Sequence, residues 1–312
     1  EEFDQVLILS GDQLYQMDFA EMLERHQESQ SDISIATIPV EAKLATDFGI
    51  LKTNPNGTIA SFIEKPDKID LHHWESNTGE LMQGEGRVYL ASMGIYLFNR
   101  SVLLKLLNHE LGAAADFGKE VIPYAIGHYK INSFQYESYW TDIGSIHSFF
   151  EANLALTADW PAFNLFDNVK TIFTRARMLP PAKTIGTYLR HTLIAEGSII
   201  NAERIENAVI GVRSRIGKGS VITSAYIMGN DFYETISDNH SSDNRNLPFL
   251  GIGEYCHLSH VIVDKDCRIG NHVVIKGGDH LENADHPQFS IRDGIVIIKK
   301  GAVINDGFEL GN

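Results

Sequence analysis

Aliphatic residues recur every six positions in the second half of this chain, and this spacing restricts the fold more than any other sequence feature. Ten positions follow it in four runs: Ile194 and Ile200; Ile210, Ile216 and Ile222; Ile252 and Leu258; Val263, Ile269 and Ile275. A hexapeptide repeat is typical of a parallel β-helix, in which each aliphatic residue points into a narrow core and stacks on the coil below. The spacing therefore predicts a β-helix over 186–312, with the polar residues 231–246 as a long loop.

The chain before residue 159 has a different pattern. Short apolar runs alternate with helical segments, one of them beginning after Asp18 and another after Ser145. The apolar runs predict buried strands at 6–9, 33–40 and 91–98. This alternation is typical of βαβ units and predicts a mostly parallel sheet. We assign 1–158 to this domain and the proline-containing residues 159–185 to a linker.

Composition excludes several classes of partner. A formal net charge of −15 disfavours nucleic acid and anionic membranes as principal partners, because both would repel the chain. No apolar run approaches the ~18 residues of a membrane span, and we expect no signal peptide. The two cysteines, Cys256 and Cys267, lack metal-site spacing and build no disulfide framework. We therefore expect a cytoplasmic protein.

Four short motifs place charged residues at expected strand ends or in loops of the first domain. They are SGDQLY at 10–15, DFGIL at 47–51, FIEKP at 62–66 and WTDIG at 140–144. Taken singly, each reads as a turn, a bulge or a core aromatic residue. Taken together, they supply two aspartates, which can hold Mg²⁺ while phosphates fill its other positions, and a lysine that can bind a sugar phosphate.

These motifs resemble a known family. With ASMGIY at 91–96, DFGKEVIP at 116–123, LPPAK at 179–183 and the hexapeptide repeat, they are similar to the sugar-nucleotide pyrophosphorylases, specifically the bacterial and plant ADP-glucose pyrophosphorylases (glucose-1-phosphate adenylyltransferases). The resemblance covers nearly the whole chain. It implies an α/β fold in which a partial, Rossmann-like nucleotide-diphospho-sugar transferase domain precedes a left-handed parallel β-helix. It also implies that ATP and α-D-glucose 1-phosphate give ADP-glucose and pyrophosphate, for glycogen or starch synthesis.

The resemblance also implies roles for individual residues. Asp12 and Asp142 match the aspartates that bind the catalytic Mg²⁺. Lys65 matches a contact to the sugar phosphate, and Glu64 matches a contact to glucose hydroxyls. Two further glucose 1-phosphate contacts of the family match Gly49 and Ser92.

The family further implies a segment of roughly one hundred residues before SGDQLY, which carries a glycine-rich phosphate loop. No such loop occurs in this sequence. We therefore expect the natural N-terminus to be missing and the chain as given to be inactive.

Members of the family are allosteric homotetramers with sugar-phosphate effectors. Four basic residues match positions that resemble activator contacts: Arg177, Lys183, Lys265 and Lys300. The same four residues are equally compatible with ordinary solvated surface charges.

Two alternative functions stay open at this point. A hexapeptide β-helix also occurs in acyltransferases, where a histidine acts as general base. The chain offers four candidates for that role: His191, His257, His260 and His272. A non-catalytic regulatory subunit of the same family is the second alternative, although retention of both Asp12 and Asp142 argues against it.

Overall fold

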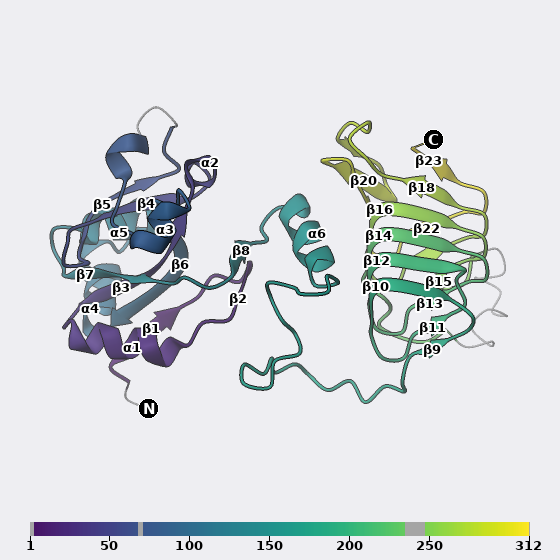
Figure 1. Cartoon of the computed structure of the whole chain (residues 1–312), viewed down its shortest axis with the longest axis horizontal. Coiled ribbons are helices and arrows are strands. Elements are labelled where there is room, and N and C mark those ends of the chain that lie inside the picture. Colours follow the sequence, from purple (N-terminus) through teal and green to yellow (C-terminus); the bar gives the residue numbers. More distant parts are fainter. Residues whose placement is uncertain (1–2, 68–70, 235–246, 312) are drawn as a thin grey trace. The chain divides into compact units, whose positions relative to one another are not determined.

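The computed structural model of the chain describes residues 3–67, 71–234 and 247–311 (Figure 1). Most of the loop predicted at 231–246 lies outside these residues. The chain divides into two compact units, Glu1–Trp140 and Thr141–Asn312.

The first unit is built on a six-stranded sheet in the order β5-β4-β6-β3-β7, with β1 added to β6. Its strands are β1 (Gln5–Ile8), β3 (Ile33–Val40), β4 (Gly49–Thr53), β5 (Ile59–Glu64), β6 (Tyr89–Asn99) and β7 (Ile131–Gln135). A separate ribbon pairs β2 (Gln13–Tyr15) with β8 (Trp140–Asp142). The helices are α1 (Phe19–Glu28), α2 (Ala42–Ala45), η1 (Leu71–Trp74), α3 (Glu80–Gly84), α4 (Arg100–Lys105), η2 (Leu106–Glu110), η3 (Phe117–Val121) and α5 (Ile122–Ala125).

The prediction of a mostly parallel sheet is wrong. Only the β3–β7 pair is parallel, whereas β1–β6, β3–β6, β4–β6 and β4–β5 are antiparallel. The crossover through α1 does leave β1 and β3 pointing the same way, as a βαβ unit requires. The long strand β6 lies between them and runs in the opposite direction. The alternation of apolar runs and helical segments thus predicted the crossover from β1 to β3, but it did not predict that β6 lies between these two strands.

Local sequence explains why the first unit forms these elements. Helix α1 begins after Asp18, whose side chain accepts a hydrogen bond from the Ala20 N–H at 2.9 Å. All eight residues of β3 are buried, because both faces of the sheet are covered. Ile33 and Ile35 belong to the core on one face, and Ala36 and Ile38 to the core on the other.

The second unit contains the predicted β-helix. One sheet runs β9-β11-β13-β15-β17-β22; another runs β10-β12-β14-β16-β21, continues into the antiparallel strands β20 and β19, and carries β18 and β23 alongside. The bounds are β9 (Lys183–Thr184), β10 (Tyr188–Ile194), β11 (Ile199–Ile200), β12 (Arg204–Ile210), β13 (Arg215–Ile216), β14 (Val221–Ile227), β15 (Gly251–Ile252), β16 (His257–Val263), β17 (Arg268–Ile269), β18 (Val274–Lys276), β19 (Ala284–Asp285), β20 (Phe289–Arg292), β21 (Ile295–Ile298), β22 (Val303–Ile304) and β23 (Glu309–Leu310). All ten hexapeptide positions line one continuous core, as predicted.

The corners of the β-helix require an uncommon backbone conformation. His191, Asn207, Ser224 and His260 occupy equivalent positions on successive coils, with φ of 47°, 49°, 46° and 53°. Asn and His are enriched in this left-handed region among residues other than glycine. These residues therefore turn the chain at one corner.

Helix α6 (Ile146–Ala155) packs against the β-helix within the second unit. Ser145 caps it, as predicted, and the structure adds a reciprocal hydrogen bond with Ser148. Phe150 is fully buried with residues of β16 and β21. The division between the two units thus falls before α6, inside β8; the boundary predicted at 158 stays a prediction.

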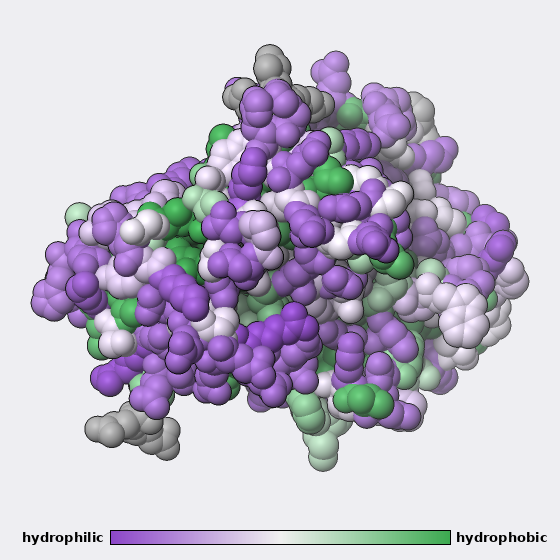
Figure 2. Space-filling view, turned by 60° about the vertical axis from the view of Figure 1, so that its left-hand side comes forward, coloured by the Kyte–Doolittle hydropathy of each residue, from purple (hydrophilic) through white to green (hydrophobic). Residues whose placement is uncertain are grey.

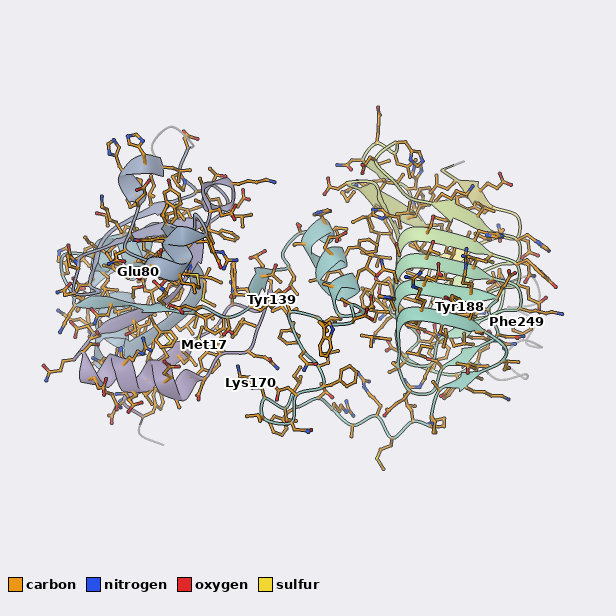
Figure 3. The ribbon with its side chains drawn as sticks, in the orientation of Figure 1. Met17, Glu80, Tyr139, Lys170, Tyr188 and Phe249 are labelled. Carbon is orange, nitrogen blue, oxygen red and sulfur yellow. The ribbon has the colours of Figure 1, made fainter. Side chains whose placement is uncertain are left out.

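Between α6 and β9, residues 156–182 form no helix or strand, in the region predicted as a linker. Large apolar side chains are exposed there, including Trp160 and Phe173. Tyr188, on the first coil of the β-helix, is also exposed (Figure 3). The face of the molecule in Figure 2 is mainly hydrophilic, with apolar residues scattered over it. In the described part of the chain, no helix combines the length and the apolar character that crossing a membrane demands.

Candidate active site

A β-bulge in β6 shapes the centre of the candidate site. Tyr96 pairs with Ile35 and Ser92 with Thr37, so β6 uses two more residues than β3 over the same stretch. Gly94 lies inside the bulge with φ of 66°. The distortion brings Ser92 within hydrogen-bonding reach of Tyr96, four residues further along the strand.

The segment SGDQ packs against this bulge. A Cβ atom added to Gly94 would lie 3.3 Å from Nε2 of Gln13 and 3.5 Å from Cβ of Ser10. Asp12 stands between these two residues in sequence and is exposed, and it accepts a hydrogen bond from the Ser10 hydroxyl. The bulge therefore brings the first motif beside Gly94.

Gly49 and Glu64 are direct partners where β4 begins and β5 ends. A Cβ on Gly49 would lie 2.5 Å from Cζ of Phe62 and 2.8 Å from Oε2 of Glu64. Only glycine fits there without displacing the Glu64 carboxylate. Gly118, from η3, approaches the same oxygen, since its added Cβ would lie 3.3 Å away.

Lys65 follows Glu64 in a left-handed conformation, with φ of 48°, and its side chain is exposed. This conformation costs an L-residue other than glycine roughly 1–2 kcal/mol. A backbone hydrogen bond from the Lys65 N–H to the Phe48 carbonyl, 3.1 Å long, holds it. Backbone strain of this kind is concentrated at functional sites.

Tyr96 and Asp116 join this group, although the motifs did not single them out. The Tyr96 ring stacks on Phe117 at 5.8 Å. Burial raises the pKa of Tyr96, the Ser92 hydrogen bond opposes that rise, and the carboxylates of Glu64 and Asp116 add to it. The phenol therefore remains a protonated hydrogen-bond donor at neutral pH. Tyr96 ends the motif ASMGIY and Asp116 begins the motif DFGKEVIP, so both lie in segments that the sequence analysis had connected with the family.

Asp142 ends β8, the partner strand of β2. Two residues earlier on β8, the Trp140 Nε1–H donates to Oε1 of Gln13 at 3.2 Å, and its ring contacts Phe48 at 5.3 Å. Oδ1 of Asp142 accepts a hydrogen bond from the Gly144 N–H at 2.9 Å. The turn after β8 thus orients this carboxylate.

The donor set suits magnesium rather than a metal held by protein alone. Within the described ranges, no group of three or more His, Cys, Asp or Glu side chains is placed to hold a metal ion. Mg²⁺ is usually bound by one or two carboxylates together with substrate phosphates and water. By donor chemistry, Asp12 and Asp142 each offer a carboxylate of the kind that Mg²⁺ accepts.

Comparison with known families agrees with this geometry. Residues 1–159 match the family described as Nucleotidyl transferase, and residues 177–308 match the GLGC left-handed parallel beta-helix domain. The chain belongs to the nucleotidyl transferase family. Together the two matches form the architecture of ADP-glucose pyrophosphorylase-like proteins and confirm the predicted fold class, including the left-handed β-helix.

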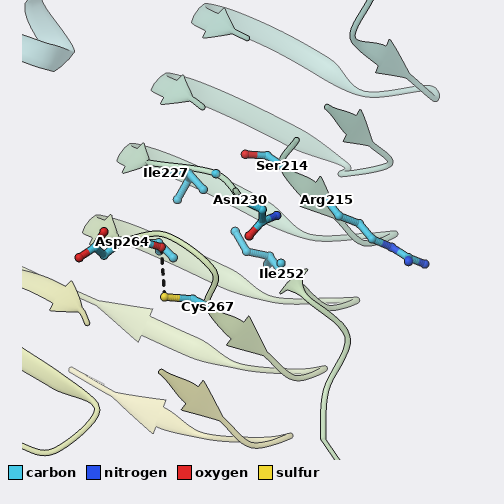
Figure 4. Close-up of a pocket in the computed structure, with 10 residues that line it drawn as sticks. Ser214, Arg215, Ile227, Asn230, Ile252, Asp264 and Cys267 are labelled. Atoms are coloured by element: carbon cyan, nitrogen blue, oxygen red, sulfur yellow. Dashed lines mark hydrogen bonds between the residues drawn. The ribbon is translucent and has the colours of Figure 1, made fainter. Parts of the chain in front are cut away.

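The β-helix of this nucleotidyltransferase holds a small cavity beside a buried cysteine. A cavity beside Ile227 and Cys267 measures about 10 Å³, which is room for about one water molecule (Figure 4). Burial raises the pKa of Cys267 to about 11, and its thiol donates to the Asp264 carbonyl at 3.1 Å. Neither the cavity nor the thiol is suited to bind or attack a substrate.

Three of the four histidines considered for acyl transfer have packing partners in the β-helix unit. His191 lies 4.0 Å from Asp159, His260 meets the Phe150 ring at 5.0 Å, and His272 stacks on Tyr255 at 5.4 Å. His257 is exposed on β16.

The four basic residues predicted as effector contacts divide into two groups. Nζ of Lys265 and Nζ of Lys300 approach the same carboxylate, Asp231, at 2.6 Å and 3.6 Å. We call these three residues the Asp231 cluster. Lys183 lies on β9, four strand steps from β17, which at about 4.8 Å per step is roughly 19 Å. Arg177 precedes β9 and is exposed. The structure therefore brings Lys265 and Lys300 together. Lys183 lies on the first coil of the β-helix, and Arg177 lies before that coil.

Proposed function

We propose that this nucleotidyltransferase transfers the adenylyl group of ATP to α-D-glucose 1-phosphate, giving ADP-glucose and pyrophosphate. The observation that carries the proposal is the cluster of hydroxyl and carboxylate groups formed by Ser92, Tyr96 and Glu64, with Lys65 next in sequence to Glu64. Such groups suit the hydroxyls and the phosphate of a sugar phosphate. The GLGC-type β-helix supports glucose 1-phosphate and ATP as the specific pair.

In this proposal the protein positions reactants and neutralises charge. An oxygen of the sugar phosphate attacks the α-phosphorus of ATP in line, and pyrophosphate leaves. Lys65 would bind the sugar phosphate, Glu64 and Ser92 would bind glucose hydroxyls, and Gly49 gives the Glu64 carboxylate its space. The Tyr96 phenol would donate a hydrogen bond to the same sugar.

Asp12 and Asp142 would hold Mg²⁺. When bound, the ion would neutralise charge that develops on the phosphates during transfer. The protein's own part is to keep the two carboxylates ready, through the Ser10 hydroxyl and the Gly144 N–H.

We further propose a cytoplasmic, homotetrameric enzyme of glycogen or starch synthesis that responds to a sugar-phosphate effector. The Asp231 cluster is the part of the effector site that the geometry supports best, because two lysines share one carboxylate there. An entering phosphate would compete with Asp231 for both ammonium groups. The proposal of a cytoplasmic location rests on the two cysteines, both free and buried.

The test is a pyrophosphate-release assay of the natural full-length protein with a matrix of substrates. ATP, UTP, GTP and dTTP would each be combined with glucose 1-phosphate, mannose 1-phosphate and N-acetylglucosamine 1-phosphate. We expect turnover with ATP and glucose 1-phosphate to exceed every other pair. Preference for another nucleotide or sugar would contradict the substrate assignment, and no turnover with any pair would favour the regulatory-subunit alternative.

A further inference from the structure

Helix α6 connects two places that the proposed function uses. Its N-cap, Ser145, comes three residues after Asp142, and the Gly144 N–H already binds that carboxylate. The reciprocal Ser145–Ser148 cap makes this junction compact. A shift of α6 would therefore move Asp142 as well.

One face of α6 packs on the β-helix. Phe150 is fully buried against β16 and β21, and the Phe149 ring meets Tyr226 of β14 edge-on, with ring centres 5.4 Å apart. Beyond the helix, the Thr157 hydroxyl donates to Oδ1 of Asn207 at 3.0 Å. These contacts hold the helix and the residues after it on the β-helix. The Phe149 side chain in this contact is only half-buried.

Tyr226 links this contact to the Asp231 cluster. It lies on β14 directly beside Ile262 of β16, and Lys265 follows three residues after Ile262. Lys265 and Asp264 are within electrostatic range of its phenol, whose pKa burial raises. Lys265 in turn binds Asp231 at 2.6 Å. A ligand that draws Lys265 away from Asp231 would change the electrostatic surroundings of Tyr226.

We propose that α6 relays occupancy of the Asp231 cluster to Asp142, with the Phe149–Tyr226 ring contact as the coupling element. The inference rests on the proposed function, because it assumes that the cluster binds a phosphate effector and that Asp142 holds the metal. Asp142, α6, Tyr226 and the Asp231 cluster all belong to one compact unit. Phe149 and Tyr226 are positioning residues, since neither is part of the proposed substrate or metal site.

Removing one ring should uncouple the two ends without harming either. In Phe149→Leu and in Tyr226→Leu, basal kcat should stay near wild type, whereas the activation ratio should fall at least about fivefold, the lower end of allosteric coupling. Tyr226→Phe keeps the ring and should activate normally. Tyr255→Leu removes a ring contact with His272 elsewhere on the β-helix and serves as the matched control.

The experiment uses fructose 1,6-bisphosphate, 3-phosphoglycerate and inorganic phosphate as probes of the natural full-length protein. Calorimetry would measure probe binding, and hydrogen exchange would follow residues 141–155 with and without probe. We expect both leucine variants to bind the probe as wild type does and to lose the exchange change at 141–155. Thermal melting would confirm that each variant is folded.

Three results would overturn the relay. The first is normal activation in both leucine variants, and the second is a wild-type enzyme that makes ADP-glucose but shows neither activation nor an exchange change with any probe. Loss of activation in Tyr255→Leu to the same extent would also refute it, because the effect would then be general. A wild-type protein that makes no ADP-glucose would instead refute the proposed function.

Discussion

The substitution Gly49→Ala tests the sugar side of the candidate site. The new Cβ would lie 2.5 Å from Cζ of Phe62 and 2.8 Å from Oε2 of Glu64. Carbon atoms in contact stand about 3.5–4.0 Å apart, so the Phe62 ring must move by roughly 1 Å, and the carboxylate must move with it. Both side chains belong to β5, and Glu64 is the direct partner of Gly49. The methyl group therefore acts on the group proposed to bind glucose.

A misplacement of about 1 Å in a positioning group can cost about 100-fold in activity. We expect the KM for glucose 1-phosphate to rise about 10- to 100-fold, equivalent to about 1.4–2.7 kcal/mol of binding free energy. The KM for ATP should change little, because Glu64 is assigned to the sugar. Steady-state kinetics with each substrate varied in turn would measure both constants.

Gly84→Ala is the matched control. Gly84 ends α3, an added Cβ meets nothing within 4 Å, and its backbone conformation suits alanine. This variant should retain wild-type kinetics, and a thermal melt should show both variants folded. A folded Gly49→Ala enzyme whose KM for glucose 1-phosphate stays within about twofold of wild type, a change too small for a lost contact, would refute the placement of the sugar at Glu64.

Three further predictions concern the metal, pH and the β-helix core. Lys65→Ala should chiefly raise the KM for glucose 1-phosphate and Asp142→Asn chiefly lower kcat; near wild-type kinetics in both would mean that the site lies elsewhere. Burial lowers the pKa of His26 below its ordinary 6.5, so the neutral ring is the folded form. The neutral ring contributes its full stability above pH 6.5, and this contribution is lost as the pH falls below that value. Between about pH 7.5 and pH 5.5, the urea midpoint of unfolding should therefore fall less in His26→Gln than in wild type. Equal falls in the two proteins would contradict this. Ile222→Ala should cost about 2–5 kcal/mol of unfolding free energy because Ile222 is fully buried, whereas Ile199→Ala, 45% exposed, should cost clearly less; equal costs in urea unfolding would refute the assigned core.

Several features of the site became visible only in the structure. Ser92 and Tyr96 are four residues apart on one strand, which in a regular strand would separate them by roughly 13 Å. The bulge at Gly94 brings them together, and its register depends on pairing with β3. The residues of ASMGIY alone do not predict how this segment pairs with β3. Likewise, the sequence predicted a helix beginning after Ser145 but not that Tyr226 and Ile262 would pack against it.

The sequence by itself determined the β-helix, because its six-residue period is a local rule that repeats on every coil. Each hexapeptide places one aliphatic residue inward, and residues such as Asn207 accept the left-handed corners. It also determined the caps of α1 and α6, since a cap is formed within a few residues. The tertiary structure alone decided that β6 lies antiparallel between β1 and β3, and that Gly49, Glu64 and Tyr96 meet. Hydrophobic patterns show which side of a strand is buried, but the choice of neighbouring strand comes from contacts between residues far apart in the chain.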